Sequence, residues 1–450
     1  MRRGALLCLA LVSCAKPPTI VEPRTRHELV FRDPESCRQC HPNHVAEWEG
    51  TMHAYAEQDP LFIAIDNIMQ NDFDGQGGQF CTQCHTVPGF LGNETQVFMD
   101  ASGFHQITDG LSAIAKHGVS CDVCHSAESI DAPFNGQLAF VPDGSVHGPL
   151  SDPMPTTAHA NIESPLHRTG ALCAACHNTQ LPITAAPVPL EQTANEWQMY
   201  KQAGGDKECQ DCHMPSRMDQ AAVDGPMRTV HAHTFVGVDI ALVDGFPDAA
   251  NRRQLVDQLI AQSATLTDTL VTDAAGTVTG LSAAIKNLAG HALPSGVTSE
   301  RRMWLEVTLR DAGGAIHYQT GMLDANGDLM DGVPEHSLTP MGDPDLWWFG
   351  ATLFKVAADT HQKEIVVFPH RATGITTQLI APLTTATRTF TFPTLPAGSY
   401  TLTVRLLFRI LQPYFLRALT TSLVAPIDPT IPARVPTYVM ASDTLTFTAQ

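Results

Sequence analysis

The sequence predicts an α+β protein, with a first region of short helices and loops followed by a C-terminal antiparallel β-sandwich. Three observations favour this class. The chain has 450 residues, which is enough for two ordinary domains. Closely spaced cysteine pairs crowd its first half, which leaves little chain for a conventional core there. From about Thr265 onward, alternating Thr, Val and Leu segments are separated by turn signals, a pattern typical of antiparallel strands.

The composition excludes several classes of protein. Hydrophobic residues make up 43 % of the chain and charged residues 16 %, as in a globular protein. The formal net charge of −19 argues against a nucleic-acid partner, because phosphate contacts need clustered cations. Beyond the N-terminus, no apolar run approaches the about 18 residues of a membrane-spanning helix. The 12 Cys and 20 His residues stand out instead.

The N-terminus has the ingredients of an export signal. A short basic head, Met1–Arg3, precedes the apolar stretch Gly4–Val12, which is too short to span a bilayer. Export places the folded chain in the cell envelope.

The end of this stretch, Leu11–Cys14 (LVSC), resembles the lipobox of bacterial lipoproteins. The resemblance implies a signal peptide over residues 1–13, a lipid anchor on Cys14 and a lipidated tether over residues 14–30. Ala15 in place of Asp implies sorting to the outer membrane, so the chain would contact a membrane through its lipid. The alternative is an ordinary cleaved signal with a coincidental cysteine.

Ten further cysteines form five pairs of one form, C-x-x-C-H, the attachment site of c-type haem. Two thiols reach the two vinyl groups of one porphyrin, and the following imidazole binds the iron. A zinc site would not require His after every pair, and a disulfide framework would not place all thiols in identical short pairs. The motifs predict five haem c groups, bound by Cys37, Cys40, Cys81, Cys84, Cys121, Cys124, Cys173, Cys176, Cys209 and Cys212, with His41, His85, His125, His177 and His213 as proximal iron ligands.

The motifs and the strand pattern divide the chain. We expect a pentahaem cytochrome c domain over residues 31–245, with short helices around the motifs, for instance from Pro34 to Glu57. A connecting helix is expected over residues 246–264 and the β-sandwich over residues 265–450. The clearest strand patterns are Thr265–Val271, Met303–Leu309, Thr389–Phe392 and Tyr400–Leu407.

The surroundings of the motifs resemble multihaem cytochromes of the cytochrome c-552/c-554 type. The matching segments are Cys37–Phe62, Phe80–His85, Gly118–His125, Cys209–Pro215 and His231–Gly237. Gly290–Gly296 (GHALPSG) also resembles a G-H-x-x-P-T-G signature of the β domain of such proteins, with Ser295 in place of Thr. The resemblance implies electron transfer, although some relatives are enzymes.

Bis-histidine ligation of all five haems needs five more histidines. His53 lies 12 residues after the first motif and, with His159 and His233, matches the surroundings of ligands in the family. His291 in the β region is the fourth favoured distal ligand, because it could reach back to a haem. The less favoured candidates are His231, His167 and His117.

Three functions remain open. The favoured one is an electron-transfer lipoprotein that exchanges electrons with redox partner proteins, drawn by its acidic charge to basic surfaces. The second is a multihaem oxidoreductase with one open haem, acting on a small nitrogen compound such as nitrite or hydroxylamine. The third is a binding module in which the β-sandwich docks onto another protein.

Overall fold

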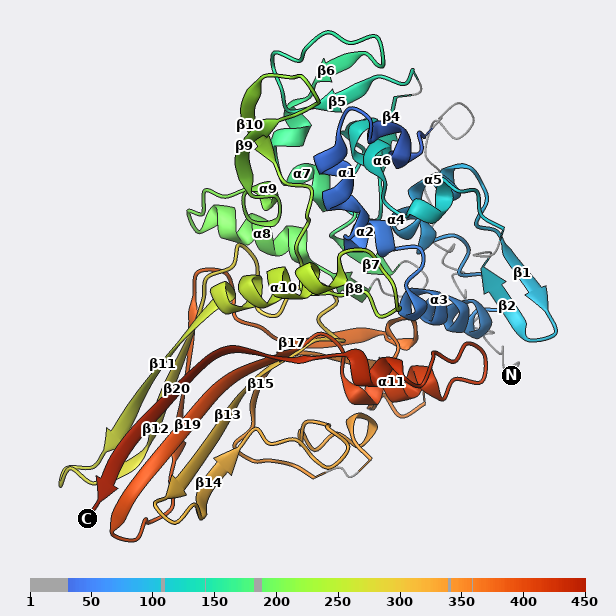
Figure 1. Ribbon diagram of the computed structural model, residues 1–450. Coiled ribbons are helices and arrows are strands. Elements are labelled where there is room, and N and C mark those ends of the chain that lie inside the picture. Colours follow the sequence, from blue (N-terminus) through green and yellow to red (C-terminus); the bar gives the residue numbers. More distant parts are fainter. Residues whose placement is uncertain (1–30, 107–109, 142, 182–187, 339–340, 358) are drawn as a thin grey trace, which may run out of the picture.

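The computed structural model describes residues 31–106, 110–141, 143–181, 188–338, 341–357 and 359–450 (Figure 1). Short helices and small strand pairs form the first region, and long antiparallel strands form the second, so the predicted α+β class is confirmed. The predicted signal peptide, the tether and Cys14 lie outside the described residues. Within the described part, no helix has the length and apolarity needed to cross a bilayer.

Helices of the first region are short because prolines and caps interrupt them. The segment from Pro34 to Glu57 forms three pieces: η1 (Pro34–Cys37), α1 (Pro42–Glu49) and α2 (Met52–Tyr55). Pro42 lacks an N–H group and therefore starts α1, and the Thr51 hydroxyl caps α2 by accepting from the Ala54 N–H. The remaining helices are α3 (Pro60–Asp72), α4 (Thr82–His85), α5 (Val87–Leu91), η2 (Ala115–His117), α6 (Cys121–His125), η3 (Pro165–Arg168), α7 (Ala171–Ala174), α8 (Thr193–Gln202) and α9 (Cys209–His213).

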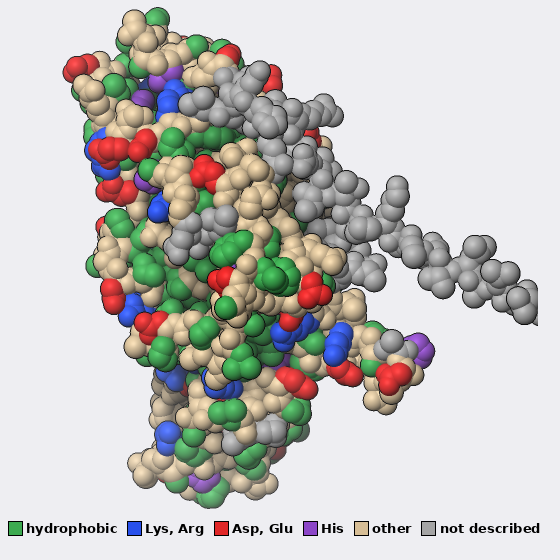
Figure 2. All heavy atoms as spheres, turned by 90° about the vertical axis from the view of Figure 1, so that its right-hand side faces the viewer, with side chains coloured by type: hydrophobic (Ala, Val, Ile, Leu, Met, Phe, Trp, Pro, Cys, Tyr) green, Lys and Arg blue, Asp and Glu red, His purple; other side chains and the backbone are tan. Residues whose placement is uncertain are grey.

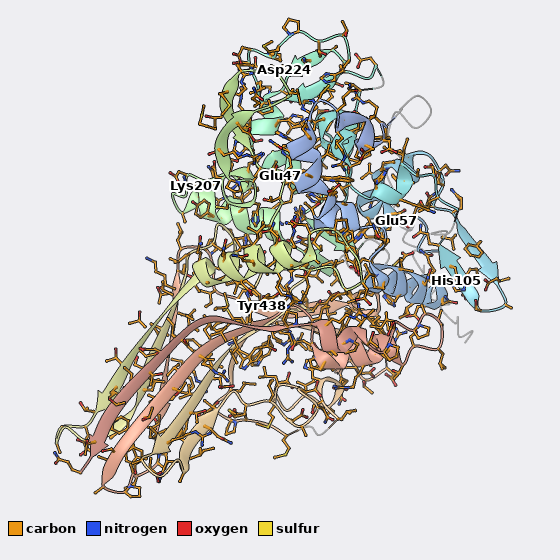
Figure 3. The ribbon with its side chains drawn as sticks, viewed as in Figure 1. Glu47, Glu57, His105, Lys207, Asp224 and Tyr438 are labelled. Carbon is orange, nitrogen blue, oxygen red and sulfur yellow. The ribbon has the colours of Figure 1, made fainter. Side chains whose placement is uncertain are left out.

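Five two-stranded pairings lie between these helices. The pair β5 with β6 is parallel and the others are antiparallel. The strands are β1 (Val97–Asp100) with β2 (Gly103–Gln106), β3 (Ala127–Ile130) with β4 (Leu138–Phe140), β5 (Val146–Gly148) with β6 (Asn161–Glu163), β7 (Thr179–Leu181) with β8 (Val188–Glu191), and β9 (Ser216–Gln220) with β10 (Met227–His231). The β1–β2 hairpin is bound to α3, because the Phe104 and Gln106 N–H groups donate to Asn71 and Asn67, and it carries His105 (Figure 3).

The second region begins with α10 (Ala249–Ser263) and contains two antiparallel sheets. The three-stranded sheet has the order β11 (Ala264–Thr272), β12 (Val278–Asn287), β18 (Thr385–Thr391). The seven-stranded sheet has the order β16 (Lys363–Ile365), β15 (Trp347–Val356), β13 (Arg302–Asp311), β19 (Gly398–Arg409), β20 (Thr437–Ala449), with β14 (Ile316–Thr320) on β13 and β17 (Gly374–Gln378) on β15. The remaining helices are η4 (Pro334–His336), η5 (Pro369–Arg371), α11 (Pro413–Thr420) and η6 (Ile431–Arg434).

One hydrophobic cluster joins the two regions. It contains Ile285 of one sheet and Leu305 of the other, both fully buried, together with Ile68 of α3 and Val256 of α10. A smaller cluster, which includes Val123 and Phe90, serves the first region. The β region therefore packs onto α3 of the first region, and α10 lies between the two regions (Figure 1).

Candidate functional site

All five cysteine motifs open onto one cavity, whose wall also includes residues of the second region such as His291 and Met303. Its volume is about 1720 Å³, larger than the about 300–1,000 Å³ of an ordinary small-molecule site. All ten motif cysteines and all five histidines that follow them line it. None of these cysteines forms a disulfide. The chain thus gathers five identical attachment motifs around a single interior space.

Each motif makes one helical turn, which brings the two thiols and the histidine together. The His41 N–H donates to the Cys37 carbonyl at 2.8 Å, and the His177 N–H donates to Cys173 at 2.9 Å. Helices α6 and α9 consist of a motif alone. Thiols separated by three residues lie on the same face of such a turn, as attachment to one porphyrin edge requires.

The motif histidines are oriented through Nδ1. In four of them this atom lies within hydrogen-bond distance of a backbone carbonyl, and in His177 it lies 3.1 Å from the Glu191 carboxylate. The four carbonyls belong to Ala221 for His41 (2.6 Å), Ala56 for His85 (3.1 Å), His147 for His125 (2.7 Å) and Val236 for His213 (2.6 Å). An Nδ1–H bond of this kind leaves Nε2 free to bind a metal.

Four of these histidines face a second imidazole at a distance that fits an iron between them. Two imidazoles on opposite sides of one iron, each bonded at about 2.0 Å, have ring centres roughly 6.3 Å apart. The observed distances are 6.4, 6.2, 6.2 and 6.3 Å. In that order the pairs are His41 with His159, His125 with His233, His177 with His53, and His213 with His291.

The arrangement fits haem in a further respect. Nδ1 of His159 is buried and has no hydrogen-bond partner within the described chain. Both the spacing of the rings and this unpartnered nitrogen suit a group that fills the cavity and bonds to imidazole. The structure thus brings His53, His159, His233 and His291 each opposite a motif histidine.

His85 differs from the other motif histidines. Its ring stacks on Phe62, with ring centres 4.0 Å apart and planes 7° from parallel. Over the described residues, no second imidazole faces it at the distance seen in the four pairs. Phe62 thus packs flat against the ring of His85.

Three less favoured histidines do not form such pairs. Nε2 of His167 lies 2.9 Å from the Cys124 carbonyl, and its ring is only 5.6 Å from that of His125. His231 places Nδ1 2.6 Å from the Met214 carbonyl. His117 lies beside Asp33 at the surface and does not line the cavity.

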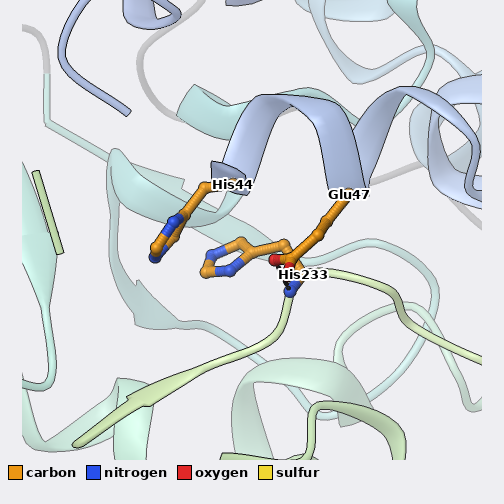
Figure 4. Close-up of side chains that lie close together, drawn as sticks. All are labelled: His44, Glu47 and His233. Atoms are coloured by element: carbon orange, nitrogen blue, oxygen red, sulfur yellow. Dashed lines mark hydrogen bonds between the residues drawn. The ribbon is translucent and has the colours of Figure 1, made fainter. Parts of the chain in front are cut away.

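His44, which is not among the predicted ligands, lies beside His233 (Figure 4). Their ring centres are 4.6 Å apart, and single ligand atoms of His44, Glu47 and His233 all lie within 4.8 Å of one another. Glu47 accepts from the His233 backbone N–H at 2.9 Å and pairs with Arg217 at 2.6 Å. These contacts make Glu47 a residue that positions His233. The sequence signal that could have indicated His44 is its position three residues after His41, one helical turn from a motif histidine.

The loop that carries His291 is held by α8. The Ser295 hydroxyl donates to the Glu196 carboxylate at 2.6 Å, and the Ala292 N–H donates to the same oxygen at 3.2 Å. From the β side, the fully buried Asn287 donates to the His291 carbonyl at 2.8 Å. Burial raises the pKa of Glu196, and the Ser295 hydrogen bond opposes that rise. His291 is thus fixed from both regions.

Two carboxyl groups that line the cavity have shifted pKa values. Burial raises the pKa of Asp66 to about 7, and this carboxyl contacts the Cys81 thiol. Burial also raises the pKa of Glu191, but His177 and Arg301 lower it by more, so the net shift is downward. Glu191 therefore stays ionised beside His177.

Contacts between motif thiols show which motifs are neighbours. Cys37 contacts Cys121, Cys84 contacts Cys176, and Cys173 contacts Cys209. The motif ending in His177 therefore touches two others, those ending in His85 and His213. The sequence contains no signal for these long-range contacts.

Comparisons with known proteins bear on the family and the fold. Residues 36–126 match the family model "Cytochrome c554 and c-prime". The structure resembles that of a penta-haem cytochrome c552 from Thermochromatium tepidum, with 18 % identity and a TM-score of 0.59, over 95 % of this chain and 100 % of that one. No curated protein matches the chain significantly. The cysteine motifs and the family match over residues 36–126 support a multihaem c-type cytochrome, and the structural likeness shows a shared fold.

Proposed function

We propose that this multihaem c-type cytochrome binds five haem c groups and carries electrons between redox partner proteins at the cell envelope. The four facing imidazole pairs are the observation that carries the proposal. When bound, haem supplies a one-electron ferric/ferrous couple. Two fixed imidazoles leave an iron no position for a substrate, which suits relay of electrons more than chemistry.

The proposed ligand set follows the pairs. His53, His159, His233 and His291 serve as distal ligands for the motifs ending in His177, His41, His125 and His213. His167 is not assigned to the motif of His125, because its ring centre lies 5.6 Å from that of His125, closer than the 6.2 Å of His233 and than an iron between two imidazoles requires. The ten motif cysteines form the thioether bonds.

The thiol contacts support a branched order of sites. Cys37 with Cys121 joins the first motif to the third, and Cys124 lies close enough to Cys176 for their charges to interact. The fourth motif contacts the fifth through Cys173 and Cys209, and it contacts the second through Cys176 and Cys84. Electrons would pass along the first, third, fourth and fifth motifs, with the second as a side branch.

The envelope location rests on the N-terminal sequence alone. The export signal and Cys14 support a lipoprotein anchored to the outer membrane. The net charge of −19 supports partners with basic surfaces. On the face drawn in Figure 2, acidic side chains are interspersed with Lys and Arg. Attraction to a basic partner would therefore depend on the overall charge of the protein more than on a single acidic patch on this face.

A second candidate function is supported by His85. Without a facing imidazole among the described residues, its iron would keep one open position for a small nitrogen compound. Asp66 contacts Cys81 of the same motif, and its pKa, raised by burial to about 7, provides a protonatable group nearby. The chain would then be an oxidoreductase as well as a carrier.

The test uses the haem-loaded full chain. A pyridine haemochrome assay should give five haems per chain, and EPR of the oxidised protein should give four low-spin haems and one high-spin haem. Fewer than five haems would contradict the proposed cofactor content. Five low-spin haems would remove the open site and with it the second function.

Two matched variants assign the signals. Cys81→Ala with Cys84→Ala should remove the high-spin signal and carbon monoxide binding by the reduced protein. Cys209→Ala with Cys212→Ala should remove a low-spin signal and leave carbon monoxide binding in place. Turnover of nitrite or hydroxylamine that depends on the first pair of cysteines would favour the enzyme, and its absence would favour the carrier.

A further inference from the structure

One of the five motif histidines has a different hydrogen-bond partner from the rest. His41, His85, His125 and His213 each place Nδ1 against a neutral backbone carbonyl. His177 places Nδ1 3.1 Å from Oε1 of Glu191. A carboxylate is a stronger acceptor than a carbonyl, because it carries a full negative charge.

Glu191 is held in place for this contact. It is the last residue of β8, its side chain is 18 % exposed, and the Thr193 hydroxyl donates to the same oxygen at 3.1 Å. Two donors thus converge on Oε1. The side chain cannot turn away from His177 without losing the Thr193 contact in a largely buried place.

The effect on a metal-bound imidazole follows from general chemistry. An acceptor that draws the Nδ1 proton toward itself makes the ring more basic at Nε2. A more basic and more negative ligand stabilises the ferric ion over the ferrous ion, and the low dielectric of the interior strengthens this preference. The reduction potential of that iron then falls.

The position of His177 makes this potential important. Its motif touches the second motif through Cys84 and Cys176 and the fifth through Cys173 and Cys209. An electron that moves between those two branches must pass this site. A low reduction potential keeps the iron at His177 oxidised. An electron therefore stays on one branch and occupies this iron only briefly when it crosses.

We infer that Glu191 is a positioning and redox-tuning residue that gives the haem at His177 the lowest potential of the four bis-histidine haems. This inference rests on the proposed function, because it requires haem iron between His177 and His53. Glu191 thereby controls how readily electrons cross between the branch of His85 and the branch of His213.

The test is a redox titration of the haem-loaded full chain, followed by absorbance and by EPR. In Glu191→Gln the neutral amide can still accept from Nδ1, so the ring keeps its orientation and loses the charged acceptor. The lowest of the low-spin potentials should rise by at least tenfold in its reduction equilibrium constant, which is about 59 mV for one electron. One low-spin EPR signal should change, and the other signals should keep their positions.

Glu208→Gln is the matched control. Glu208 is another carboxylate on the cavity wall, beside Cys209, and it contacts Lys201 and the Gly170 N–H instead of a histidine. Glu208→Gln therefore measures how much the loss of a nearby charge, without a hydrogen bond to histidine, changes the reduction potentials. The inference requires a clearly larger shift in Glu191→Gln than in Glu208→Gln.

The outcomes separate this inference from the proposed function. A haem count below five in the unchanged chain would contradict the proposed function. Five haems with no selective shift in Glu191→Gln would overturn the role of Glu191 alone. Should Glu191→Gln fail to bind all its haems, Glu191→Asp keeps the charge and withdraws it by one methylene. It should raise the same potential, and an unchanged potential would equally overturn the role.

Discussion

The ring of His291 lies 6.3 Å from the ring of His213, with the two planes only 16° apart. His213 ends the last cysteine motif, whereas His291 belongs to the loop after β12, in the region of long strands. The two regions therefore meet at a pair of imidazoles. Under the proposed ligation, the β region completes a redox site and is more than a passive attachment.

Replacement of His291 by Ala should convert one low-spin haem to a high-spin haem. The iron at His213 would lose its distal ligand, while the thioether bonds to Cys209 and Cys212 would keep the haem attached. EPR of the oxidised chain, together with a haem count that stays at five, checks this expectation.

His317→Ala is the control for this prediction. His317 lies on β14 and contacts Asp311, away from the cavity. It should leave the spectrum unchanged. A His291→Ala spectrum identical to that of the unchanged chain would mean that another residue binds the iron.

Loss of the Ser295 hydroxyl should weaken the loop that carries His291. Ser295→Ala leaves the largely buried Glu196 carboxylate with one partner fewer, which should lower the free energy of unfolding by about 1.5–3 kcal/mol. Urea unfolding of the haem-loaded chain measures the change. Ser295→Thr retains a hydroxyl and should stay close to the unchanged chain; equal losses in both variants would assign the effect to packing.

Arg32 should stabilise the third motif through a buried ion pair. Its backbone N–H and its guanidinium both donate to Asp122, with distances of 2.7 to 2.9 Å, and the Asp122 side chain is only 4 % exposed. Arg32→Ala leaves that charge buried with one backbone donor, so the free energy of unfolding should fall by about 3 kcal/mol. Thermal or urea unfolding provides the measurement.

Arg38→Ala provides the comparison for Arg32. Arg38 pairs with Glu35 and Glu49 at the surface, where an ion pair contributes about 0–1 kcal/mol. The prediction fails if the two arginine variants lose similar amounts of stability.

The β region should lose stability as the pH rises from about 4 to 7. Burial, and then the negative charge of Asp443, raise the pKa of Asp268 to about 7, and neither carboxyl oxygen has a hydrogen-bond partner in the described structure. An unfolded Asp has a pKa of about 3.9, so the folded state binds the proton more tightly. The stabilisation is complete below about pH 4 and is lost as the pH passes 7.

Asp268→Asn should reduce this loss, because the amide has no charge to bury, whereas the raised pKa of Glu300 keeps the remainder. The slope that disappears is at most about 1.4 kcal/mol per pH unit. Urea unfolding between pH 4 and pH 8, followed by tryptophan fluorescence, measures it. Asp257→Asn on the exposed face of α10 is the control and should keep the slope. An unchanged slope in Asp268→Asn would contradict the role of Asp268.

Local chemistry explains what the sequence could predict. From Leu305 to Leu309 apolar and polar residues alternate, and the structure has β13 over Arg302–Asp311. The motifs are equally local, since both thiols and the imidazole share one turn. The segment from Pro34 to Glu57 shows that helix breaks, too, follow from prolines and caps.

Long-range geometry explains what the sequence could not predict. His53 matches a family element, but nothing near it in sequence says that it faces His177. The contact of Glu191 with His177 and the position of His44 beside His233 likewise depend on how distant segments pack. The motifs can therefore be identified in the sequence, whereas the partner of each histidine is a property of the folded chain.

The facing imidazoles also bear on why the first region holds its shape. Each pair joins residues roughly 80 to 120 positions apart, so an iron between them would act as a cross-link. In the chain-entropy model, closing a loop of about 100 residues costs the unfolded state about 4.7 kcal/mol. The helices here are short and the local apolar cluster around Val123 is small. Such cross-links would restrict the unfolded chain much as disulfides do, although all ten motif thiols are assigned to thioether bonds.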